Sequence, residues 1–575
     1  MDYYLKERGF TLAQYDPSNI KSQWVKNTEM RNKTLKTVIS DKGQWYTITI
    51  KSRGLIIEIR DSLKLIPMSI ATIGDSFGTK HRKTEIEYTG FRQPYGVITD
   101  KEKEYLSNDL YVLKEALEIM FNDGHNKLTI GSCCFSEFKS TVDKEDYNTW
   151  FPNLYEIETP LGVSYGEYIQ KSYYGGWCYV AKPGIKKNGV TADVNSLYPS
   201  MMHSCSGNVY PIGKPKWFYK EIPEQAWNDN QYFFVRFKCR FFLKEGYLPF
   251  QHIRKNHRYK STENLKTSDI RLKDGSYSSY YYDIEGNKQL ATVELTLTKT
   301  DYVLFFEHYN VTDFELLDGC MFYAISGLFD EYINKYMHIK QNSKGALRTE
   351  AKLFLNNLYG KMASNPDSSY KVPVIVDDIV KFYPVDAQDK TPGYIPIGSA
   401  ITSYARNFTI RRAQLNYHGS NKPGFCYADT DSIHCDISPD KLVGIDVHPT
   451  NMCCWKLESY WDSAIFCRQK TYIEHVTHED GEPIEHPYYN IKCAGMTSNC
   501  KDIVDRALCG EVDREGDTPN KTKFIHSLKA KEFFESFKGY SDFKVGLKVP
   551  GKLQPKRIPG GIVLAEDYYT MKEGI

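Results

Sequence analysis

The sequence predicts a mixed α/β fold built from several subdomains. The chain has 575 residues, too many for one compact core, so about three to five subdomains are expected. Hydrophobic residues at 41% and charged residues at 25% are ordinary for globular proteins and argue against disorder or a fibrous fold. Segments with strand-like alternation and segments with helical spacing are interspersed along the chain.

The N-terminal region is predicted to be α/β. Residues 43–50 and 54–63 alternate apolar and polar residues as paired strands do, and residues 101–121 carry apolar residues at helical spacing. Residues 189–195 predict a further strand that stops at a Ser-Leu-Tyr-Pro turn. Asp193 is then expected near the end of that strand, where its side chain can meet a ligand.

A long insert, rich in Tyr and basic residues, spans about 205–325 and predicts mixed strands and exposed loops. Its Tyr-rich piece, residues 276–283, predicts a strand or loop with aromatic packing, and a base-stacking surface is the weaker alternative. Residues 343–364 predict a helix that ends before Pro366. One stripe of this helix can grip a triphosphate, and a solvated face is the alternative. The stripe consists of Arg348, Lys352, Asn356 and Tyr359.

Residues 424–438 predict a strand, a tight turn and a second strand, with Asp429 and Asp431 at the bend. Two acids at this spacing are common in surface turns, but here apolar and aromatic residues flank them, and uncompensated buried carboxylates are costly. Together with Asp193 they predict a site for two Mg²⁺ ions. Two such ions about 3.5 to 4 Å apart can hold the attacking and leaving oxygens of a phosphoryl transfer.

Composition and charge also bear on location, metal binding and nucleic-acid binding. No apolar run of membrane-spanning length and no signal peptide occur, so a cytoplasmic protein without a membrane partner is expected. The 14 cysteines include no C-x-x-C pair and are interpreted as reduced thiols, while the spacing of His475 and His478 is only a weak zinc signal. The net charge is +2, but residues 521–560 are strongly basic, which fits either phosphate binding or a solvated surface.

Four segments occur in the order of the polymerase motifs of family B DNA polymerases, which this chain resembles. They are DVNSLYPS (193–200), K-x-x-x-N-x-x-Y-G (352–360), YADTDS (427–432) and KTY (470–472). Four further segments resemble the protein-primed phage branch of that family, whose replicases start synthesis from a terminal protein. These are YYGG (173–176), LKEGY (243–247), KCAGMT (492–497) and IPGGIVLAEDYYTMK (558–572).

The resemblance implies a right-hand polymerase fold with palm, fingers and thumb, two branch-specific insertions and a truncated RNase H-like exonuclease domain. The implied segments are an exonuclease-like domain at 1–131, palm at 132–205, a terminal-protein and DNA-binding insertion at 206–327, fingers at 328–363, a strand-displacement and processivity insertion at 364–394, palm again at 395–492, and thumb at 493–575.

The implied activity is DNA-directed DNA polymerisation, in which a primer 3′-hydroxyl or a terminal-protein hydroxyl attacks the α-phosphorus of a dNTP during phage or plasmid replication. The implied cofactors are two Mg²⁺ ions, with Mn²⁺ as an alternative. The implied partners are template and primer DNA, dNTPs and a terminal protein, and a monomer is expected. A non-catalytic DNA-binding or terminal-protein-binding remnant is the alternative from another class. A reverse transcriptase or RNA polymerase is a further alternative, although D-T-D differs from the adjacent acidic pair of reverse transcriptases.

Site residues are carried over from the matching motifs. Asp193, Asp429 and Asp431 are the implied catalytic carboxylates, and Asp193, Val194 and Asp431 the implied metal ligands. The implied nucleotide-binding residues are Ser196, Leu197, Tyr198, Lys340, Arg348, Lys352, Asn356 and Tyr359. The implied DNA- and primer-binding residues are Tyr173, Gly175, Gly176, Thr430, Lys470 and Tyr472.

The chain departs from the pattern at its start. The first two exonuclease motifs of the branch, which supply metal-binding acids, have no match, and the sequence aligns from just downstream of them. The later part of the exonuclease is matched by Lys83, Tyr88, Tyr105 and Asp109. A single carboxylate cannot assemble a two-metal site, so exonuclease activity is predicted to be absent from this chain.

Overall fold

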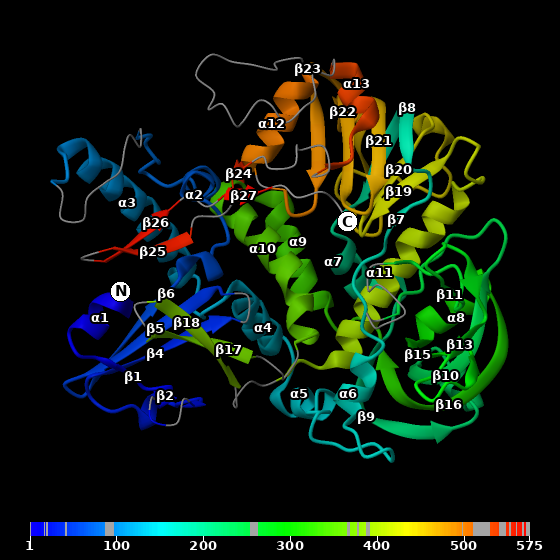
Figure 1. Ribbon diagram of the computed structural model, residues 1–575, viewed down its shortest axis with the longest axis horizontal. Coiled ribbons are helices and arrows are strands. Elements are labelled where there is room, and N and C mark those ends of the chain that lie inside the picture. The colour runs from blue at the N-terminus through cyan, green and yellow to red at the C-terminus, as the bar shows by residue number, and fades with distance from the viewer. Residues whose placement is uncertain are drawn as a thin grey trace. The chain divides into compact units, whose positions relative to one another are not determined.

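The N-terminal segments with alternating apolar residues form strands in the computed structural model, as predicted (Figure 1). The strand β5 (Trp45–Ser52) pairs antiparallel with β4 (Thr34–Ser40) on one side and with β6 (Leu55–Arg60) on the other. The helix predicted over 101–121 is α3 (Asp100–Asn122). It begins with a capping box, in which Thr99 and the carboxylate of Glu102 satisfy each other's backbone N–H groups.

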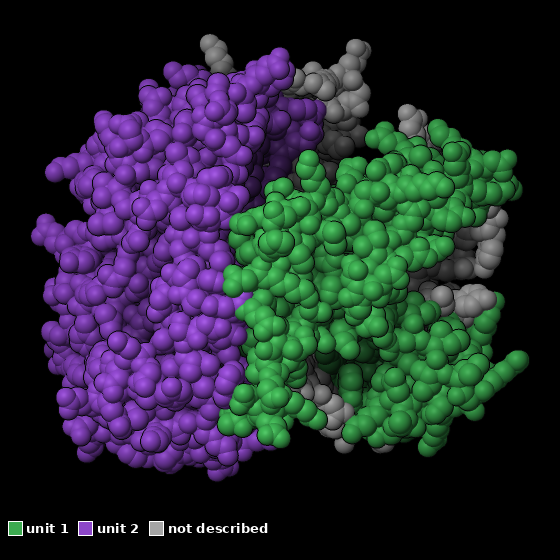
Figure 2. All heavy atoms as spheres, turned by 180° about the vertical axis from the view of Figure 1, so that it is seen from behind, with its two compact units in different colours: residues 1–149, 331–395, 554–565 green, residues 150–330, 396–553, 566–575 purple. Residues whose placement is uncertain are grey.

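The structure describes most of the chain and divides it into two units. The described residues are 2–16, 18, 21–40, 43–86, 97–253, 263–364, 369–376, 379–386, 392–496, 498–509, 530–539, 548–550, 554–558, 561–565 and 568–570. Unit 1 comprises residues 1–149, 331–395 and 554–565, and unit 2 comprises residues 150–330, 396–553 and 566–575 (Figure 2).

A sheet with the strand order β18-β17-β4-β5-β6 is the framework of unit 1. The hairpin of β17 (Ser369–Val376) and β18 (Ile379–Asp386) joins this sheet because Tyr370 pairs with Ser40 of β4. The outermost strand β6 exposes a row of aliphatic side chains, with Leu55 at 68% and Ile57 at 52%. Other N-terminal elements are α1 (Asp2–Glu7), β1 (Thr11–Leu12), β2 (Tyr15–Asp16), β3 (Lys21–Ser22) and α2 (Ile70–Phe77).

Helix α10 (Gly345–Met362) confirms the helix predicted over 343–364 and packs inside unit 1 against α4 (Ile130–Ser140) and α9 (Asp330–Asn342). The ring of Tyr336 stacks on Phe354 with the centroids 4.6 Å apart. The hydroxyl of Tyr332 donates to the carbonyl of Phe354 at 3.0 Å. The apolar face of α10 is therefore buried, and the opposite face carries its polar residues.

A seven-stranded sheet is the framework of unit 2, with the order β23-β22-β21-β8-β20-β19-β7. The long strand β8 (Gly184–Val194) lies in the middle, between β20 (Ser432–Cys435) and β21 (Trp455–Arg468). The predicted strand, turn and strand over 424–438 is the hairpin of β19 (Phe425–Asp429) and β20. The remaining strands of the sheet are β7 (Cys178–Val180), β22 (Thr471–Glu479) and β23 (Glu482–Cys493).

The insert between about 205 and 325 forms a second sheet of unit 2 with the order β15-β10-β16-β9. Its strands are β9 (Tyr210–Tyr219), β10 (Gln231–Leu243), β15 (Val293–Thr298) and β16 (Tyr309–Ile325). The expectation of strands and loops is correct but incomplete, because residues 299–308 form the helix α8 (Lys299–His308), which Thr298 caps. Short strands in this insert are β11 (Ile270–Arg271), β12 (Tyr277–Ser278), β13 (Tyr280–Tyr282) and β14 (Lys288–Leu290).

Helix α11 (Ile395–Leu415) lies in the core that both sheets of unit 2 share. Phe408 of this helix stacks on Trp455 of β21, and Ala405 and Ile410 are buried. Other elements of this unit are α6 (Tyr165–Gln170), α7 (Leu197–Met202), α12 (Ser498–Leu508), α13 (Ala530–Ser536), β24 (Lys548–Pro550) and β27 (Tyr568–Thr570). Outside it lie β25 (Gln554–Ile558) and β26 (Gly561–Ala565), and α5 (Lys144–Trp150) spans the boundary. None of the described helices is long and apolar enough to cross a membrane.

Two local predictions need correction. The Ser-Leu-Tyr-Pro segment is not a simple turn, because Ser196 has a φ of 52° and α7 starts directly after it. The Tyr-rich piece forms strands as predicted, but the expected aromatic packing is wrong for Tyr282, which is 71% exposed, and for Tyr277, which is 59% exposed. The basic stretch predicted over 521–560 lies largely outside the described residues.

Candidate active site

Asp193 lies near the end of β8, and Asp431 lies in the bend directly before the neighbouring strand β20 of the seven-stranded sheet. Asp193 is next to last in β8 and pairs in register with Ser432 of β20. The backbone N–H of Val194 donates to the carbonyl of Asp431 at 2.8 Å. Thr430 has a φ of 63° at the bend, so the chain reverses between Asp429 and Asp431. The strand pairing thus brings together acids that are far apart in the sequence.

The third carboxylate, Asp429, is held by a cation. Lys470 Nζ lies 3.2 Å from Asp429 Oδ1, and the hydroxyl of Tyr427 donates to Oδ2 at 3.3 Å. By contrast, the side chains of Asp193 and Asp431 accept no hydrogen bond from any other residue that the structure describes. Within the described residues no three Asp, Glu, His or Cys side chains form a ready metal cluster. The structure therefore presents a pair, Asp193 and Asp431, with Asp429 directed to Lys470.

Burial and like charge govern the electrostatics of the pair. Burial, then the charges of Asp431 and Glu458, raise the pKa of Asp193 to about 8, although Lys456 lowers it. Burial also raises the pKa of Asp431, with Asp429 and Glu458 adding to the effect. The pair is consequently a half-buried site that disfavours its own negative charge.

Glu458 is a member of this site that the sequence reasoning missed. It is the extra residue of a bulge in β21, between Leu457, which pairs with Ala192, and Ser459, which pairs with Thr191. Only the pairing of β21 with β8 places this carboxylate near Asp193, and no local sequence pattern announces the bulge.

A divalent cation fits the donor set at this site. The side-chain donors are hard carboxylate oxygens, which Mg²⁺ and Mn²⁺ prefer, and their raised pKa values reflect burial that disfavours the ionised form. The residues that would hold one here are Asp193 and Asp431, with the backbone at Val194.

A buried polar network fixes the strands beneath the pair. Glu474 Oε1 lies 2.6 Å from His434 Nδ1 and accepts from the hydroxyl of Thr191 at 2.9 Å. Glu474 Oε2 accepts from Asn490 Nδ2 at 3.1 Å, and Ser432 Oγ lies 3.2 Å from His434 Nε2. The network links β8, β20, β22 and β23, and it holds the register that juxtaposes Asp193 and Asp431.

The segment after Asp193 is fastened to the loop before β21. The side-chain amide of Asn195 donates to the carbonyls of His448 at 2.6 Å and Asn451 at 3.1 Å. Among the predicted nucleotide-binding residues, Ser196 and Tyr198 are half-buried. Leu197 is buried in the main core of unit 2, so only its backbone groups could contact a ligand.

The YYGG segment lies against the D-T-D bend. A Cβ at Gly176 would fall 2.5 Å from Thr430 Oγ1, so glycine is required by this close approach. The N–H of Thr430 donates to the carbonyl of Trp177 at 2.7 Å. Gly175 is exposed and Tyr173 half-buried. The predicted template-tracking segment and the predicted catalytic bend therefore form one surface.

Arg406 of α11 holds this segment in place, and the sequence reasoning missed it. Its Nη1 donates to the carbonyls of Tyr174 at 2.7 Å and Gly175 at 2.8 Å, and its guanidinium pairs with Asp301 of α8. Arg406 and Asp301 are each only 2% exposed. The sequence shows an arginine within a long helical segment, and this does not identify its partner.

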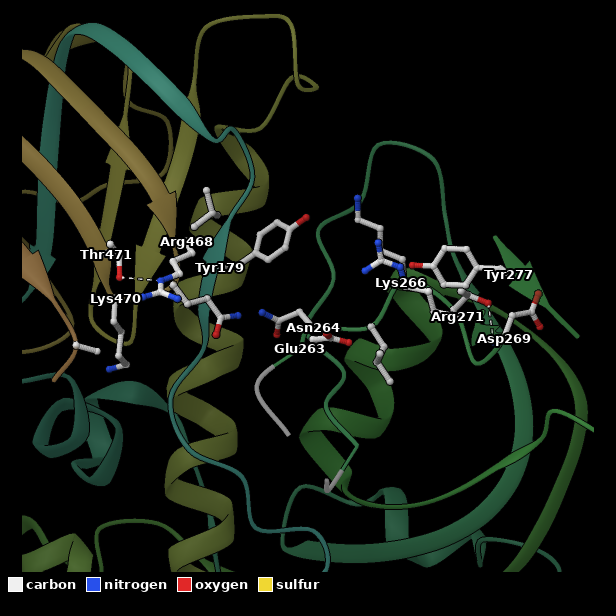
Figure 3. A pocket seen from close by; sticks show the side chains of 15 residues that line it. Tyr179, Glu263, Asn264, Lys266, Asp269, Arg271, Tyr277, Arg468, Lys470 and Thr471 are labelled. Carbon is white, nitrogen blue, oxygen red and sulfur yellow. Dashed lines mark hydrogen bonds between the residues drawn. The ribbon is translucent and has the colours of Figure 1, made fainter. Parts of the chain in front are cut away.

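Lys470 and its neighbours line a cavity of about 740 Å³ in unit 2 (Figure 3). Figure 3 shows Arg468, Lys470 and Thr471 on one side and the insert residues Lys266 and Arg271 on the other. The other labelled lining residues are Tyr179, Glu263, Asn264, Asp269 and Tyr277. Tyr472, predicted as a primer-binding residue, is buried against Tyr427 with the ring centroids 5.0 Å apart.

The predicted triphosphate-binding stripe lies on α10 in unit 1. Arg348, Lys352 and Asn356 are exposed, and Tyr359 is half-buried. Neither Arg348 nor Lys352 forms an ion pair with a described carboxylate. Burial lowers the pKa of Lys340 on α9, and the nearby charges of Lys352 and Arg348 lower it further. Three cationic side chains therefore gather within this unit.

The predicted exonuclease residues form a small cluster in unit 1. Lys83 Nζ donates to the hydroxyl of Tyr105 at 2.7 Å and lies 3.2 Å from Asp109 Oδ2. The hydrogen bond that Lys83 donates to Tyr105, followed by the interaction with Asp109, raises the pKa of Lys83. Tyr88 lies outside the described residues.

Comparisons with known proteins agree with this fold. The family model for DNA polymerase type B, organellar and viral, matches residues 2–123 and 91–443. The DNA polymerase of Bacillus phage Nf is 33% identical over 560 residues, covering 94% of this chain and 85% of the phage protein. The polymerase of Streptococcus phage Cp-1 is 30% identical over 547 residues, covering 93% and 83%.

Solved structures extend the comparison to three dimensions. Phi29 DNA polymerase complexed with primer-template DNA and incoming nucleotide substrates has a TM-score of 0.76 at 31% identity, covering 99% of this chain and 88% of that one. Phi29 polymerase with single-stranded DNA has a TM-score of 0.73. The chain belongs to the type B DNA polymerase family, alongside the phage enzymes. It is a template-directed DNA polymerase, and the coverage of nearly the whole chain argues against a binding remnant.

Replacing Arg406 with Ala should lower the free energy of unfolding by about 3 to 5 kcal/mol, because Asp301 would stay buried without its cation. Urea denaturation measures the effect. The matched control is Arg411→Ala on the same helix, whose ion pair with Glu307 is partly exposed and worth at most about 1 kcal/mol. Equal losses for the two variants would contradict the assigned role of Arg406.

The Asp193 pKa predicts how Mg²⁺ binding depends on pH. A carboxyl whose pKa is raised in the folded state favours folding when protonated, so the metal-free protein loses this stability as pH rises from about 4 to about 8. Below about pH 7 a cation must displace the proton, so the rise in Tm caused by Mg²⁺ should be larger near pH 8.5 than near pH 6. Thermal unfolding with and without Mg²⁺ measures it. Asp193→Asn should flatten the pH dependence, and an equal Mg²⁺ effect at both pH values in the parent would refute the prediction.

Proposed function

We propose that Asp193 and Asp431 hold two Mg²⁺ ions, or Mn²⁺, for attack of a 3′-hydroxyl on the α-phosphorus of a dNTP. The observation that carries this proposal is the pairing of β8 with β20, which brings the buried carboxylates of Asp193 and Asp431 together. Cations held there would neutralise phosphate charge and make the attacking hydroxyl easier to deprotonate. Asp193 and Asp431 would position the cations, while Asp429 is paired with Lys470.

The incoming triphosphate is assigned to α10 and α9. Arg348, Lys352 and Lys340 supply three positive charges, and Asn356 and Tyr359 continue the same face of α10. Charge-assisted hydrogen bonds from Arg and Lys are the strong ones for phosphate oxygens. In unit 2, Ser196, the backbone of Leu197 and the ring of Tyr198 are assigned to nucleotide binding from the family resemblance.

Template and primer are assigned to the surface around the D-T-D bend. Tyr173, Gly175, Gly176 and Thr430 form the template side, because the YYGG segment packs directly against the bend. Lys470 is assigned to the primer end. Lys266, Arg271 and Arg468, which line the cavity of Figure 3, extend the positive charge toward the primer phosphates. Tyr472 acts from beneath, by supporting Tyr427, rather than by touching DNA.

Initiation on a terminal protein, replication as a monomer and the seven-part division of the chain are proposed from the family resemblance. The sheet of β9, β10, β15 and β16 is the region assigned to the terminal protein. Transfer of a labelled dNMP onto a candidate priming protein is the assay for initiation. The cytoplasmic location expected from the sequence stays a prediction.

Asp431→Asn should reduce primer extension by about 10³-fold or more, because the cation site loses one of its two paired charges. The matched control is Asp462→Asn on β21 of the same sheet, whose carboxylate pairs with His475 near the surface. Steady-state primer extension with dNTPs and Mg²⁺ measures the change, and cooperative thermal unfolding of both variants verifies folding. Synthesis by Asp431→Asn at the rate of the control would remove Asp431 from the active site.

The chain is predicted not to degrade single-stranded DNA, because Asp109 is the one carboxylate among the described residues of its cluster and Lys83 pairs with it. Incubating labelled single-stranded DNA with the polymerase and Mg²⁺ in the absence of dNTPs measures this. Lys83→Ala serves as a control that frees the carboxylate without adding a second one. Efficient shortening of the DNA by the parent chain would show that the prediction is wrong.

A further inference from the structure

Two cysteines far apart in the sequence meet beside the segment that follows Asp193. Cys205 lies in the 3₁₀ turn Ser204–Ser206 and is exposed, and Cys453 lies in the loop before β21 and is partly buried. Their Sγ atoms are 3.4 Å apart, although the residues are separated by 248 positions. We propose that Cys205 and Cys453 are a redox modification site, at which a reversible disulfide clamps loop 446–454 to residues 195–206.

The backbones around both sulfurs are already held close together. The N–H of Cys453 donates to Ser200 Oγ at 3.0 Å, and the N–H of Cys205 donates to His203 Nδ1 at 3.0 Å. A disulfide needs the sulfurs at about 2.05 Å, so a closure of little more than an ångström suffices. Side-chain rotation and a small loop shift can supply it.

The backbone at Cys453 does not explain the choice of cysteine. Its φ is 59°, in the left-handed region that glycine adopts without strain and that other residues rarely occupy. Local conformation would favour Gly or Asn at this position. A cysteine here is better explained by what its thiol contacts, namely Cys205.

Their surroundings distinguish Cys205 and Cys453 from the other cysteines of the protein. Burial, together with the contact to Cys205, raises the pKa of Cys453 to about 12, so the exposed Cys205 is the thiol that meets a solute first. Burial raises the pKa of the adjacent Cys454 as well. Most of the other cysteines are buried in the cores of the two units, where solutes do not reach them.

The oxidant is a small-molecule disulfide such as oxidised glutathione. The thiolate of Cys205 attacks one sulfur of that disulfide, its S–S bond breaks, and one glutathione thiolate leaves. The thiolate of Cys453 then attacks the Cys205 sulfur of the mixed disulfide and expels the second glutathione. Two electrons pass from the protein sulfurs to glutathione, and the two thiol protons leave on the two reduced glutathione molecules.

Formation of the disulfide would shift the segment that is assigned to nucleotide binding. The N–H of Asn195 donates to the carbonyl of Cys454 at 3.0 Å, and Ser200 Oγ donates to the carbonyl of Asn195 at 2.7 Å. Movement of Cys453 is therefore transmitted to both ends of residues 195–200, which include Ser196 and Tyr198. This consequence rests on the proposed function, whereas formation of the disulfide does not.

The first experiment tests the disulfide itself. The purified chain is equilibrated with oxidised glutathione, and non-reduced peptides are mapped by mass spectrometry. A Cys205–Cys453 cross-link is expected, together with a rise in Tm of about 3 to 10 °C because the bond closes a long loop. Dithiothreitol should reverse both changes. Cys205→Ser and Cys453→Ser should abolish them, and Cys454→Ser, the matched control, should retain them.

No cross-link at this pair, or a cross-link through Cys454 instead, would overturn the proposal. The second experiment measures the KM for dNTP in primer extension before and after oxidation. The oxidised enzyme should show a KM raised by about three- to tenfold with a smaller change in kcat, and Cys205→Ser should show equal KM values under both conditions. An unchanged KM in a fully cross-linked enzyme would refute the clamp, while the disulfide would stand independently of the polymerase assignments.

Discussion

The burial of two neighbouring carboxylates is the constraint on which the site in unit 2 depends. Asp193 lies near the end of β8, Asp431 directly precedes its paired strand β20, and neither side chain receives a hydrogen bond from another described residue. Burial, followed by the charges of Asp431 and Glu458, raises the pKa of Asp193 to about 8, so this carboxyl takes up a proton when no cation is bound. A divalent cation removes the conflict without protonation. The burial that destabilises the ionised, metal-free carboxylates therefore also favours their binding of a cation.

The surrounding structure holds the pair in place rather than relieving it. The Glu474 network below is buried and satisfied on both carboxylate oxygens, which makes slippage of β8 against β20 costly. The bulge at Glu458 adds a further negative charge from β21. Arg406 fastens the YYGG segment through two backbone carbonyls. Buried polar contacts thus fix the positions of the site residues, and the apolar core keeps the surrounding sheet rigid.

The nucleotide-binding assignment depends on a different balance. The cationic face of α10 belongs to unit 1, where the opposite face of the helix is buried through Phe354, Leu355 and Leu358. Burial of that apolar face leaves Arg348 and Lys352 in solvent, where their mutual repulsion is tolerable and an anionic ligand is favoured. The loop beside Cys453 is held by a different kind of contact, namely hydrogen bonds to Asn195 and Ser200.

Local patterns in the sequence were enough to predict the strands β5, β6, β8, β19 and β20 and the helices α3 and α10. These predictions succeed because periodicity and flanking apolar residues report on burial one segment at a time. The same patterns single out Asp193, Asp429 and Asp431 as candidate catalytic carboxylates, a role that stays a prediction. The sequence by itself could not show that Asp429 is directed to Lys470, that Glu458 approaches through a bulge, or that Arg406 holds the YYGG segment. It also gave no sign that Cys205 and Cys453 meet. These features depend on strand register and on contacts between residues hundreds of positions apart, and only the packing of the complete fold determines such contacts.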